Sequence, residues 1–489
     1  MGARTGKEFL EGLRGDNREL WLGPERVADV TTHPKLAAGA QALAAVFDRQ
    51  FEYPDDCLMD DPETGEPINV SHMIPRSKED LFRRHVALER IAESTVGLMG
   101  RTPDYMNVTY AGFAGERGIW AGPDGANAQG AANLVEYQKC LARLDISLTH
   151  TIVHPTIDRA TDQSFVGNEV PLHKVGETAD NIVVRGARIL STLAPYADEL
   201  AVYPGHPLPP EDGLEPYALA FCIPMDTPGL IFLCRDSAAT PDEDPFDRPL
   251  STRFDEQDAF IIFDDVEVPR DRVHIDSVVD VYNSVMMPTA WWPNIMQQTT
   301  VRAYTKLQFA YGLATRMAEA VNDQTPHTVD MLGELASYVE MTRSALLLAE
   351  EHAYERADGV WFPDGRPLHP MRSLLARWFP RVNEILVSIG SHNLLATPSR
   401  GMLDDERLRP LIEQFLHGAN GLGAEDRAAV YRLAWDFVGS SLGARNELYE
   451  RNYLASARTN HTALHNFYAD KARGFELVDM MLAAGREKS

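Results

Sequence analysis

The sequence predicts an α+β protein in which a helical region, a β-rich region and a second helical region follow one another. The first third carries apolar residues at helical spacing, residues 149–275 carry short β-branched runs separated by Gly, Pro and Asp, and helical patterns return from about residue 292. A chain of 489 residues has room for two or three domains. We expect a helical domain at residues 1–147, a β domain at 148–276 and a C-terminal helical bundle at 277–489.

Two helix starts are marked in the N-terminal region. Thr5 and Glu8 have the spacing of a capping box and precede an apolar run. Ser77 and Asp80 have the same spacing and precede Leu81, which opens a run of apolar residues at helical intervals. Both pairs predict that a helix begins immediately after them.

The middle region has the composition and the turn spacing of antiparallel β structure. Its apolar runs are short and rich in Val, Ile, Leu and aromatic residues, and Gly, Pro and Asp separate them. The predicted strands are residues 181–184, 200–203, 217–223, 230–233 and 259–263. In the C-terminal region, apolar residues at helical spacing between 335 and 349 and between 430 and 437 predict long helices.

The charge of the chain limits the kinds of binding partner that we expect. The formal net charge is −26, which repels nucleic acid and anionic lipid, so we expect neither a nucleic-acid partner nor a membrane partner. No apolar run approaches the roughly 20 residues that cross a bilayer. Four scattered cysteines without a CxxC pair predict reduced thiols and a cytoplasmic location.

Common catalytic signatures are missing from the sequence. It contains no GxGxxG after a strand, no P-loop, no HExxH and no GxSxG. His150 and His154 have the spacing of a metal pair on a helix. The β-branched residues between them predict an extended segment, which separates the two Cα atoms by about 13 Å. We therefore expect no metal site.

The segment at residues 100–105 predicts a helix start that carries polar groups. Thr102 is a good N-cap and Pro103 suits the first helical position. Arg101 and Tyr105 would then lie together where a helix begins, a place that attracts anionic ligand groups. The structural alternative is an Arg paired with a carboxylate and a Tyr at the edge of the core.

Two further segments combine polar residues with a predicted boundary. Residues 149–160 lie where the helical and β regions meet, and His150 or His154 is a candidate acid–base group there. A pair of interdomain histidines explains the same pattern. Residues 443–452 follow a predicted helix and combine small residues with Arg445, which suits a phosphate, although an ordinary helical corner explains it equally well.

Taken together, these segments resemble a known family, the flavin-dependent two-component aromatic hydroxylases typified by the oxygenase component of 4-hydroxyphenylacetate 3-monooxygenase. The matching phrases occur in the family's order and run through nearly the whole chain. They are residues 4–11, 31–34, 99–105, His150 with 158–159, 184–188, 245–253, 263–269 and 443–451.

The resemblance implies the acyl-CoA-dehydrogenase-like fold, a homotetramer and FAD as cofactor. FAD would bind non-covalently and diffusibly as FADH2, delivered by a separate NAD(P)H-dependent flavin reductase. Oxygen would add to the flavin as a C4a-hydroperoxide, and one oxygen atom would enter an electron-rich aromatic substrate, ortho to a phenol hydroxyl. The C-terminal bundle would serve flavin binding and tetramerisation.

The resemblance also implies roles for individual residues. Arg101, Tyr105 and His150 match the positions that bind the substrate hydroxyl, and Thr192 matches a threonine that contacts the flavin ring. The remaining cofactor positions fall in two stretches, Thr156, Ile157, Asp158 and Arg159, and Gly443, Ala444, Arg445 and Asn446.

One departure from the family pattern concerns the substrate. Where 4-hydroxyphenylacetate enzymes have Ser-Thr at the loop that holds the carboxylate end, this chain has Gly205 and His206. We therefore expect a different phenol, free or carrier-tethered, or a related electron-rich heteroaromatic.

Two other functions compete with the hydroxylase. An acyl-CoA-dehydrogenase-like oxidoreductase of the same fold would need a catalytic Glu and bound oxidised FAD. A non-catalytic scaffold would have no need to retain Arg101, Tyr105, His150 and Thr192 together.

Overall fold

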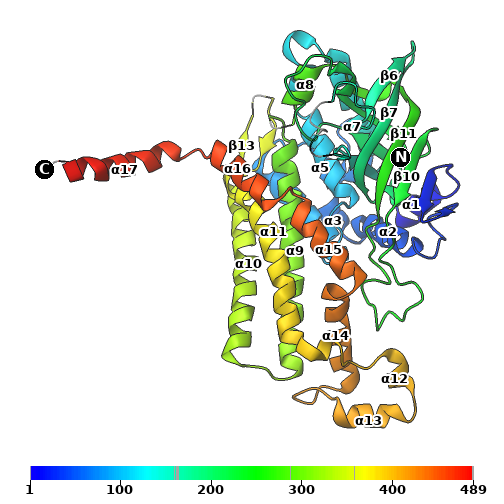
Figure 1. Ribbon diagram of the computed structural model, residues 1–489, viewed down its shortest axis with the longest axis vertical. Coiled ribbons are helices and arrows are strands. Elements are labelled where there is room, and N and C mark those ends of the chain that lie inside the picture. The colour runs from blue at the N-terminus through cyan, green and yellow to red at the C-terminus, as the bar shows by residue number, and fades with distance from the viewer. Residues whose placement is uncertain (1, 159, 161–164, 287, 357, 487–489) are drawn as a thin grey trace.

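The computed structural model describes residues 2–158, 160, 165–286, 288–356 and 358–486. Helices and sheets occur in the predicted order, with a β layer on one side of the molecule and a long helical bundle on the other (Figure 1). The predicted α+β class is confirmed.

The N-terminal region is mainly helical, and its first helix starts as predicted. Thr5 Oγ1 accepts a hydrogen bond from the amide of Glu8, whose carboxylate accepts one from the amide of Thr5. At the second start only half of the predicted box forms, because the carboxylate of Asp80 accepts from the amide of Arg76 rather than from Ser77. The elements are α1 (Gly6–Leu13), β1 (Glu19–Leu22), β2 (Glu25–Arg26), α2 (Ala37–Glu52), α3 (Pro54–Cys57), β3 (Leu58–Asp60), β4 (Pro67–Asn69), α4 (Lys78–Ser94), α5 (Pro103–Ala114), α6 (Arg117–Ala121) and α7 (Ala128–Arg143).

The β layer consists of a six-stranded sheet, β2-β1-β10-β11-β7-β6, and a four-stranded sheet, β12-β9-β8-β5. Most neighbouring strands are antiparallel as predicted, but β1 runs parallel to β10, and β5 runs parallel to β8. Parallel neighbours need a long connection, which the intervening chain provides. The strands of the middle region are β5 (Leu148–Thr151), β6 (His173–Glu177), β7 (Asn181–Thr192), β8 (Glu199–Val202), β9 (Leu219–Pro224), β10 (Leu230–Cys234), β11 (Asp258–Pro269) and β12 (Val273–Asp276).

The C-terminal region is a helical bundle built around one long buried helix, α9. Its final helix, α17, projects away from the body of the molecule (Figure 1). The elements are α8 (Val279–Ser284), α9 (Trp291–Ala320), α10 (Pro326–Glu351), β13 (Tyr354–Glu355), β14 (Trp361–Phe362), α11 (Gly365–Gly390), α12 (Arg400–Asp404), α13 (Leu408–Phe415), α14 (Ala424–Val438), α15 (Ser441–Asn452), α16 (Ala457–Phe467) and α17 (Lys471–Arg486).

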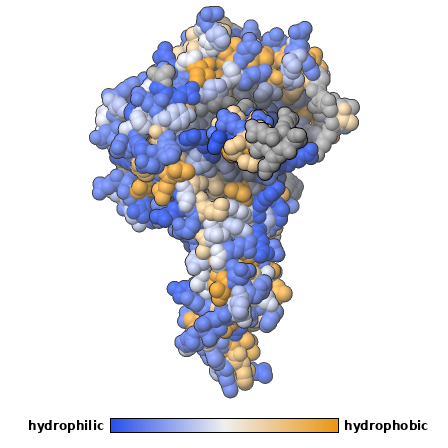
Figure 2. Space-filling model, turned by 90° about the vertical axis from the view of Figure 1, so that its left-hand side faces the viewer, coloured by the Kyte–Doolittle hydropathy of each residue, from blue (hydrophilic) through white to orange (hydrophobic). Residues whose placement is uncertain are grey.

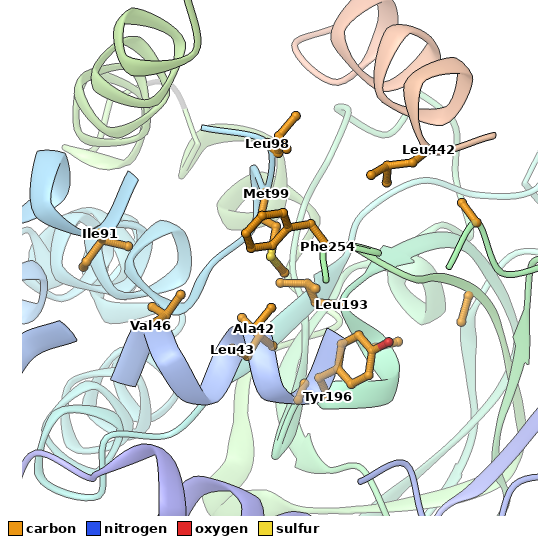
Figure 3. Packing of buried hydrophobic residues seen from close by; sticks show 14 of the residues in the cluster. Ala42, Leu43, Val46, Ile91, Leu98, Met99, Leu193, Tyr196, Phe254 and Leu442 are labelled. Carbon is orange, nitrogen blue, oxygen red and sulfur yellow. The ribbon is translucent and has the colours of Figure 1, made fainter. Parts of the chain in front are cut away.

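A shared apolar core joins the three regions (Figure 3). Val46 of α2, Met99 before α5, Leu193 after β7, Phe254 before β11 and Leu442 of α15 all belong to it and are buried. Burial of this surface fixes the start of α5 against the β layer and the start of α15, and the ends of these elements carry the polar residues described below.

The helices and the cysteines bear on two of the sequence-based expectations, namely the lack of a membrane span and the reduced thiols. Among the described helices, none is long and apolar enough to span a bilayer. All four cysteines are free thiols, with Cys57 and Cys222 buried and Cys140 and Cys234 half-buried.

Candidate active site

A pocket of about 430 Å³ opens where the ends of β5 and β7 face helix α15. It draws its lining from all three regions of the chain. The lining residues are Arg101, His150, Ile152, Val153, Ile189, Leu190, Thr192, Arg235, Asp258, Arg445, Leu448, Tyr449, Asn452 and Tyr453.

Arg101 enters this pocket from the start of α5. Thr102 is the N-cap residue and Pro103 the first helical residue, as predicted, although the Thr102 side chain makes no capping hydrogen bond. Glu256 Oε1 accepts hydrogen bonds from the amides of Gly100 and Arg101, each at 2.6 Å, which anchors the turn. The guanidinium carbon of Arg101 lies 3.9 Å from the centre of the Tyr105 ring. Nη1 of Arg101 is buried and has no hydrogen-bond partner in the described part of the protein.

His150 lies on β5 between two aromatic rings. Its imidazole stacks on Tyr105 with ring centres 5.4 Å apart and on Tyr203 at 5.5 Å. Burial, reinforced by the positive charge of Arg101, holds the pKa of His150 well below its usual range. The ring is therefore neutral at physiological pH and has one nitrogen that can accept a proton.

The structure thus brings the three predicted catalytic residues together. Tyr105 contacts both Arg101 and His150, and two of the three line the pocket directly. Arg101 forms no ion pair with any carboxylate among the described residues, contrary to the structural alternative of an Arg and carboxylate pair.

A network of hydrogen bonds forms the polar side of the pocket. Thr192 Oγ1 donates to Asp258 Oδ1 at 2.7 Å, and Arg445 Nη2 donates to the same oxygen at 2.8 Å. Arg235 Nε donates to Asp258 Oδ2 at 2.8 Å. Burial alone would raise the pKa of Asp258, but Arg445 and Arg235 outweigh it and hold that pKa below its usual range. Asp258 is therefore a fixed anion that orients Thr192.

A β-bulge explains why apolar side chains face the pocket next to this polar network. The pairing of β7 with β11 shifts register between Arg188 and Ser191, and Leu190 adopts a φ of +59°. The bulge places Ile189 and Leu190 side by side on the pocket surface, where they are 38% and 53% exposed. Exposed apolar surface beside fixed hydrogen-bonding groups suits a flat ring system. The buried hydroxyl of Tyr449 has no hydrogen-bond partner in the described part of the chain.

The other predicted cofactor residues lie in three different settings. Of the stretch Gly443, Ala444, Arg445 and Asn446, Arg445 lines the pocket, while Gly443 lies in the first turn of α15 and is capped by Ser440. Thr156, Ile157 and Asp158 are exposed in the segment after Val153, and Arg159 lies outside the described residues. Nothing in the geometry decides the roles of these residues, which stay predictions.

Gly205 and His206 lie in the loop after β8. A Cβ atom on Gly205 would come within 2.4 Å of the Ile152 carbonyl oxygen, so the loop packs directly on the segment that follows His150. His206 is exposed.

Several residues at the site escaped the sequence-based prediction. Tyr203 ends a predicted strand, and Asp258 directly precedes one, so neither differs from an ordinary strand boundary in sequence. Tyr449 and Tyr453 did carry a signal, because they are four residues apart in the segment 443–452 and its helical continuation and hence share one helix face.

Comparison with known proteins identifies the family. The family models for the N-terminal and C-terminal parts of 4-hydroxyphenylacetate 3-hydroxylase match residues 5–275 and 282–483. The chain is 37% identical over 468 residues to the 4-hydroxyphenylacetate 3-monooxygenase oxygenase component of Thermus thermophilus, covering 95% of each chain. It is 30% identical to a Streptomyces globisporus monooxygenase for (3S)-3-amino-3-(3-chloro-4-hydroxyphenyl)propanoyl-[peptidyl-carrier protein SgcC2], covering 96% of this chain and 88% of the relative.

A solved structure has the same fold over its full length. The oxygenase component HpaB of 4-hydroxyphenylacetate 3-monooxygenase, complexed with FAD and 4-hydroxyphenylacetate, superposes with a TM-score of 0.92 at 35% identity and 100% coverage of both chains. The architecture is therefore that of the solved HpaB oxygenase. Because both family models match and the Thermus relative aligns over 95% of the chain, the chain belongs to the 4-hydroxyphenylacetate 3-hydroxylase family of flavin-dependent oxygenases.

Proposed function

We propose that this protein is the oxygenase of a two-component system that hydroxylates a phenol ortho to its hydroxyl group, using O2 and FADH2 from a separate NAD(P)H-dependent flavin reductase. The observation that carries the proposal is the convergence of Arg101, Tyr105 and neutral His150 at one end of a pocket whose other side, around Thr192, suits a flavin. The FAD and 4-hydroxyphenylacetate bound in the solved HpaB structure support the same assignment.

The chemistry of these residues fits hydroxylation. When bound, reduced flavin supplies an electrophilic oxygen atom derived from O2. Arg101 keeps its charge at any working pH and stabilises negative charge on a phenol oxygen nearby. Neutral His150 can accept a hydrogen bond from the phenol hydroxyl, and with Arg101 it shifts the bound phenol towards phenolate, which is a better nucleophile at its ortho carbon. The packed rings of Tyr105 and Tyr203 keep water away from His150.

The dehydrogenase alternative has less support. It requires a carboxylate free to act as a base, and Asp258 is the one carboxylate among the described residues that line the pocket. Asp258 is held by both Arg235 and Arg445, so it is poorly suited to take a proton.

The substrate in this proposal is a para-substituted phenol. The Thermus and Streptomyces relatives are both named for substrates of this type. Gly205 and His206 lie at the loop beyond His150, and their difference from the Ser-Thr of the resemblance favours a phenol other than 4-hydroxyphenylacetate.

We include a homotetramer and a cytoplasmic location in the proposal. Support for assembly comes from apolar side chains that the single chain leaves exposed, on the side where α17 projects (Figure 2). They include Val329, Met341 and Leu348 on α10 and Phe475, Val478, Met481 and Leu482 on α17. The four free thiols favour a reducing compartment. Light scattering of the purified protein measures the number of subunits.

The decisive experiment combines O2 consumption with product analysis, using FADH2 from a flavin reductase and a panel of phenols. The wild type should form catechols. Arg101→Gln and His150→Ala should still consume O2 but release hydrogen peroxide in place of catechol, because oxygen activation continues without a reactive phenolate. Arg343→Ala, on the exposed side of α10, is the control and should behave as wild type. Retained coupling in either site variant would remove that residue from the mechanism, and no catechol from any phenol would refute the proposed function.

A further inference from the structure

Glu256 is a buried carboxylate whose two oxygens contact different regions of the chain. It lies two residues before β11, which begins at Asp258, and is 1% exposed. Oε1 accepts hydrogen bonds from the amides of Gly100 and Arg101 at the start of α5, each at 2.6 Å. Oε2 accepts one from Nη1 of Arg445, on α15, at 2.7 Å. One side chain therefore joins the N-terminal region to the C-terminal bundle.

The groups that Glu256 joins belong to opposite sides of the pocket. We call Arg101, Tyr105 and His150 the phenol side, and Thr192, Asp258 and Arg445 the flavin side. The flavin side is itself connected, because Arg445 Nη2 and the Thr192 hydroxyl both donate to Asp258 Oδ1. A series of hydrogen bonds thus runs from the backbone of Arg101 through Glu256 and Arg445 to the rest of the flavin side.

The backbone around Glu256 is held in place by separate contacts. Its own carbonyl oxygen accepts a hydrogen bond from Arg235 Nη2 at 3.0 Å. The carbonyl oxygen of Gln257 accepts one from the amide of Leu193 at 2.7 Å. A fixed backbone leaves the buried side chain little freedom, so a displacement at one end of its carboxylate is transmitted to the other end.

Every atom that hydrogen-bonds to this carboxylate is a donor. An ionised carboxylate offers two acceptor oxygens and no donor. A glutamine of the same shape offers one oxygen and one NH2 group, so the NH2 group would face either the two amides or the guanidinium of Arg445. Glu256→Gln therefore breaks one end of the contact in either orientation of its amide.

We infer that Glu256 is a positioning residue that couples the two sides of the pocket, so that flavin binding holds Arg101 in place for the phenol. Hydroxylation requires the phenol and the flavin to keep one fixed relation, since a small misplacement of reacting groups is costly in rate. The inference rests on the proposed function and deepens it, because it names the contact that keeps O2 consumption coupled to hydroxylation.

The first test follows hydrogen exchange of the amides of Gly100 and Arg101 by mass spectrometry, without FAD and with saturating FAD. In the wild type, FAD should slow this exchange about 5-fold or more, the lower end of coupling between two sites. In Glu256→Gln saturated with FAD, the exchange should not depend on FAD. Asp255→Asn is the matched control and should behave as wild type. Asp255 is as buried as Glu256, and its carboxylate binds Arg235, Ser237 and the amide of Ala238 rather than α5.

The second test measures the ratio of hydrogen peroxide to catechol, using the phenol of the panel that gives the most catechol. Glu256→Gln should raise this ratio about 10-fold or more while O2 consumption continues, because one hydrogen bond to a charged group contributes at least that factor. A residue with a merely structural role would not change the ratio, since the molecules that remain folded would divide O2 between the two products as the wild type does.

The outcomes separate this inference from the proposed function and from a folding defect. Exchange that does not respond to FAD in the wild type would overturn the inference, whether or not the variant folds. FAD-dependent protection or an unchanged product ratio in folded Glu256→Gln would overturn it too, as would loss of the FAD effect in Asp255→Asn. If FAD protects the wild type but not Glu256→Gln and no phenol gives catechol, the coupling stands and the proposed function is refuted.

Discussion

Glu450→Gln is expected to lower the free energy of unfolding by about 3–5 kcal/mol, the cost of breaking a buried ion pair by removing one partner. Glu450 of α15 accepts hydrogen bonds from Arg302 at 2.7 and 3.0 Å and from Lys306 at 2.8 Å. All three side chains are at most 4% exposed. The substitution keeps the shape of the side chain but leaves two buried cations without a carboxylate.

The pKa of Glu450 gives an independent magnitude. Burial would raise this pKa, but Arg302 and Lys306 hold it at about 2, against about 4.3 in an unfolded chain. This difference corresponds to about 3 kcal/mol. Because the folded pKa is depressed, the contribution is complete above about pH 4.3 and is lost as the pH falls through 2.

The assay is urea unfolding at pH 7 and constant protein concentration, followed by circular dichroism. Glu447→Gln on the same helix is the control, since its ion-pair partner Arg451 is half exposed and such pairs contribute about 0–1 kcal/mol. The Gln side chain keeps an oxygen that can accept the hydrogen bond from Asn383. The reasoning is refuted if the two variants shift the unfolding midpoint equally. Since α15 carries Tyr449 and is followed directly by Tyr453, and both line the pocket, loss of the ion pair should weaken FAD binding as well.

Three further predictions test the start of α5 and the loop after β8. Burial raises the pKa of Asp104 to about 6, so ionisation of Asp104 destabilises the fold as the pH rises from about 4 to 6. Asp104→Asn should therefore raise the melting temperature at pH 8 but not at pH 4. Equal shifts of the melting temperature at both pH values would show that the buried charge is not the cause. Gly100→Ala places a Cβ 2.2 Å from the Tyr449 hydroxyl and should reduce FAD affinity measured by fluorescence titration; unchanged affinity would show that the tyrosine moves freely. Gly205→Ser forces the loop away from the Ile152 carbonyl and should raise KM for the phenol more than it lowers kcat, whereas unchanged kinetics would place the loop outside the substrate site.

Local patterns predicted the elements well, because caps and apolar spacing act within a few residues. The capping pair at Thr5 and Glu8, the strand that contains residues 181–184 and the helix that contains residues 430–437 are all present. The parallel pairing of β1 with β10 was not predicted, since it joins segments some 200 residues apart in sequence and depends on tertiary packing.

The candidate site was predictable to the extent that its residues stood at element boundaries. Arg101 and His150 were found this way. Asp258 was missed, because a carboxylate shared by two arginines from distant segments has no sequence signature. Its role becomes visible only when Arg235 and Arg445 are placed beside it.

In the proposed homotetramer, the projecting helix α17 makes dilution a variable in every experiment on this protein. A 16-residue helix that projects away from the body of its own chain is marginal in water, so in this proposal α17 is helical only when another subunit covers it. Dissociated subunits would then offer trypsin the bonds after Lys471 and Arg473. The rate of nicking at these two bonds, followed against protein concentration, would report how tightly the subunits hold together under the dilute conditions of a kinetic assay.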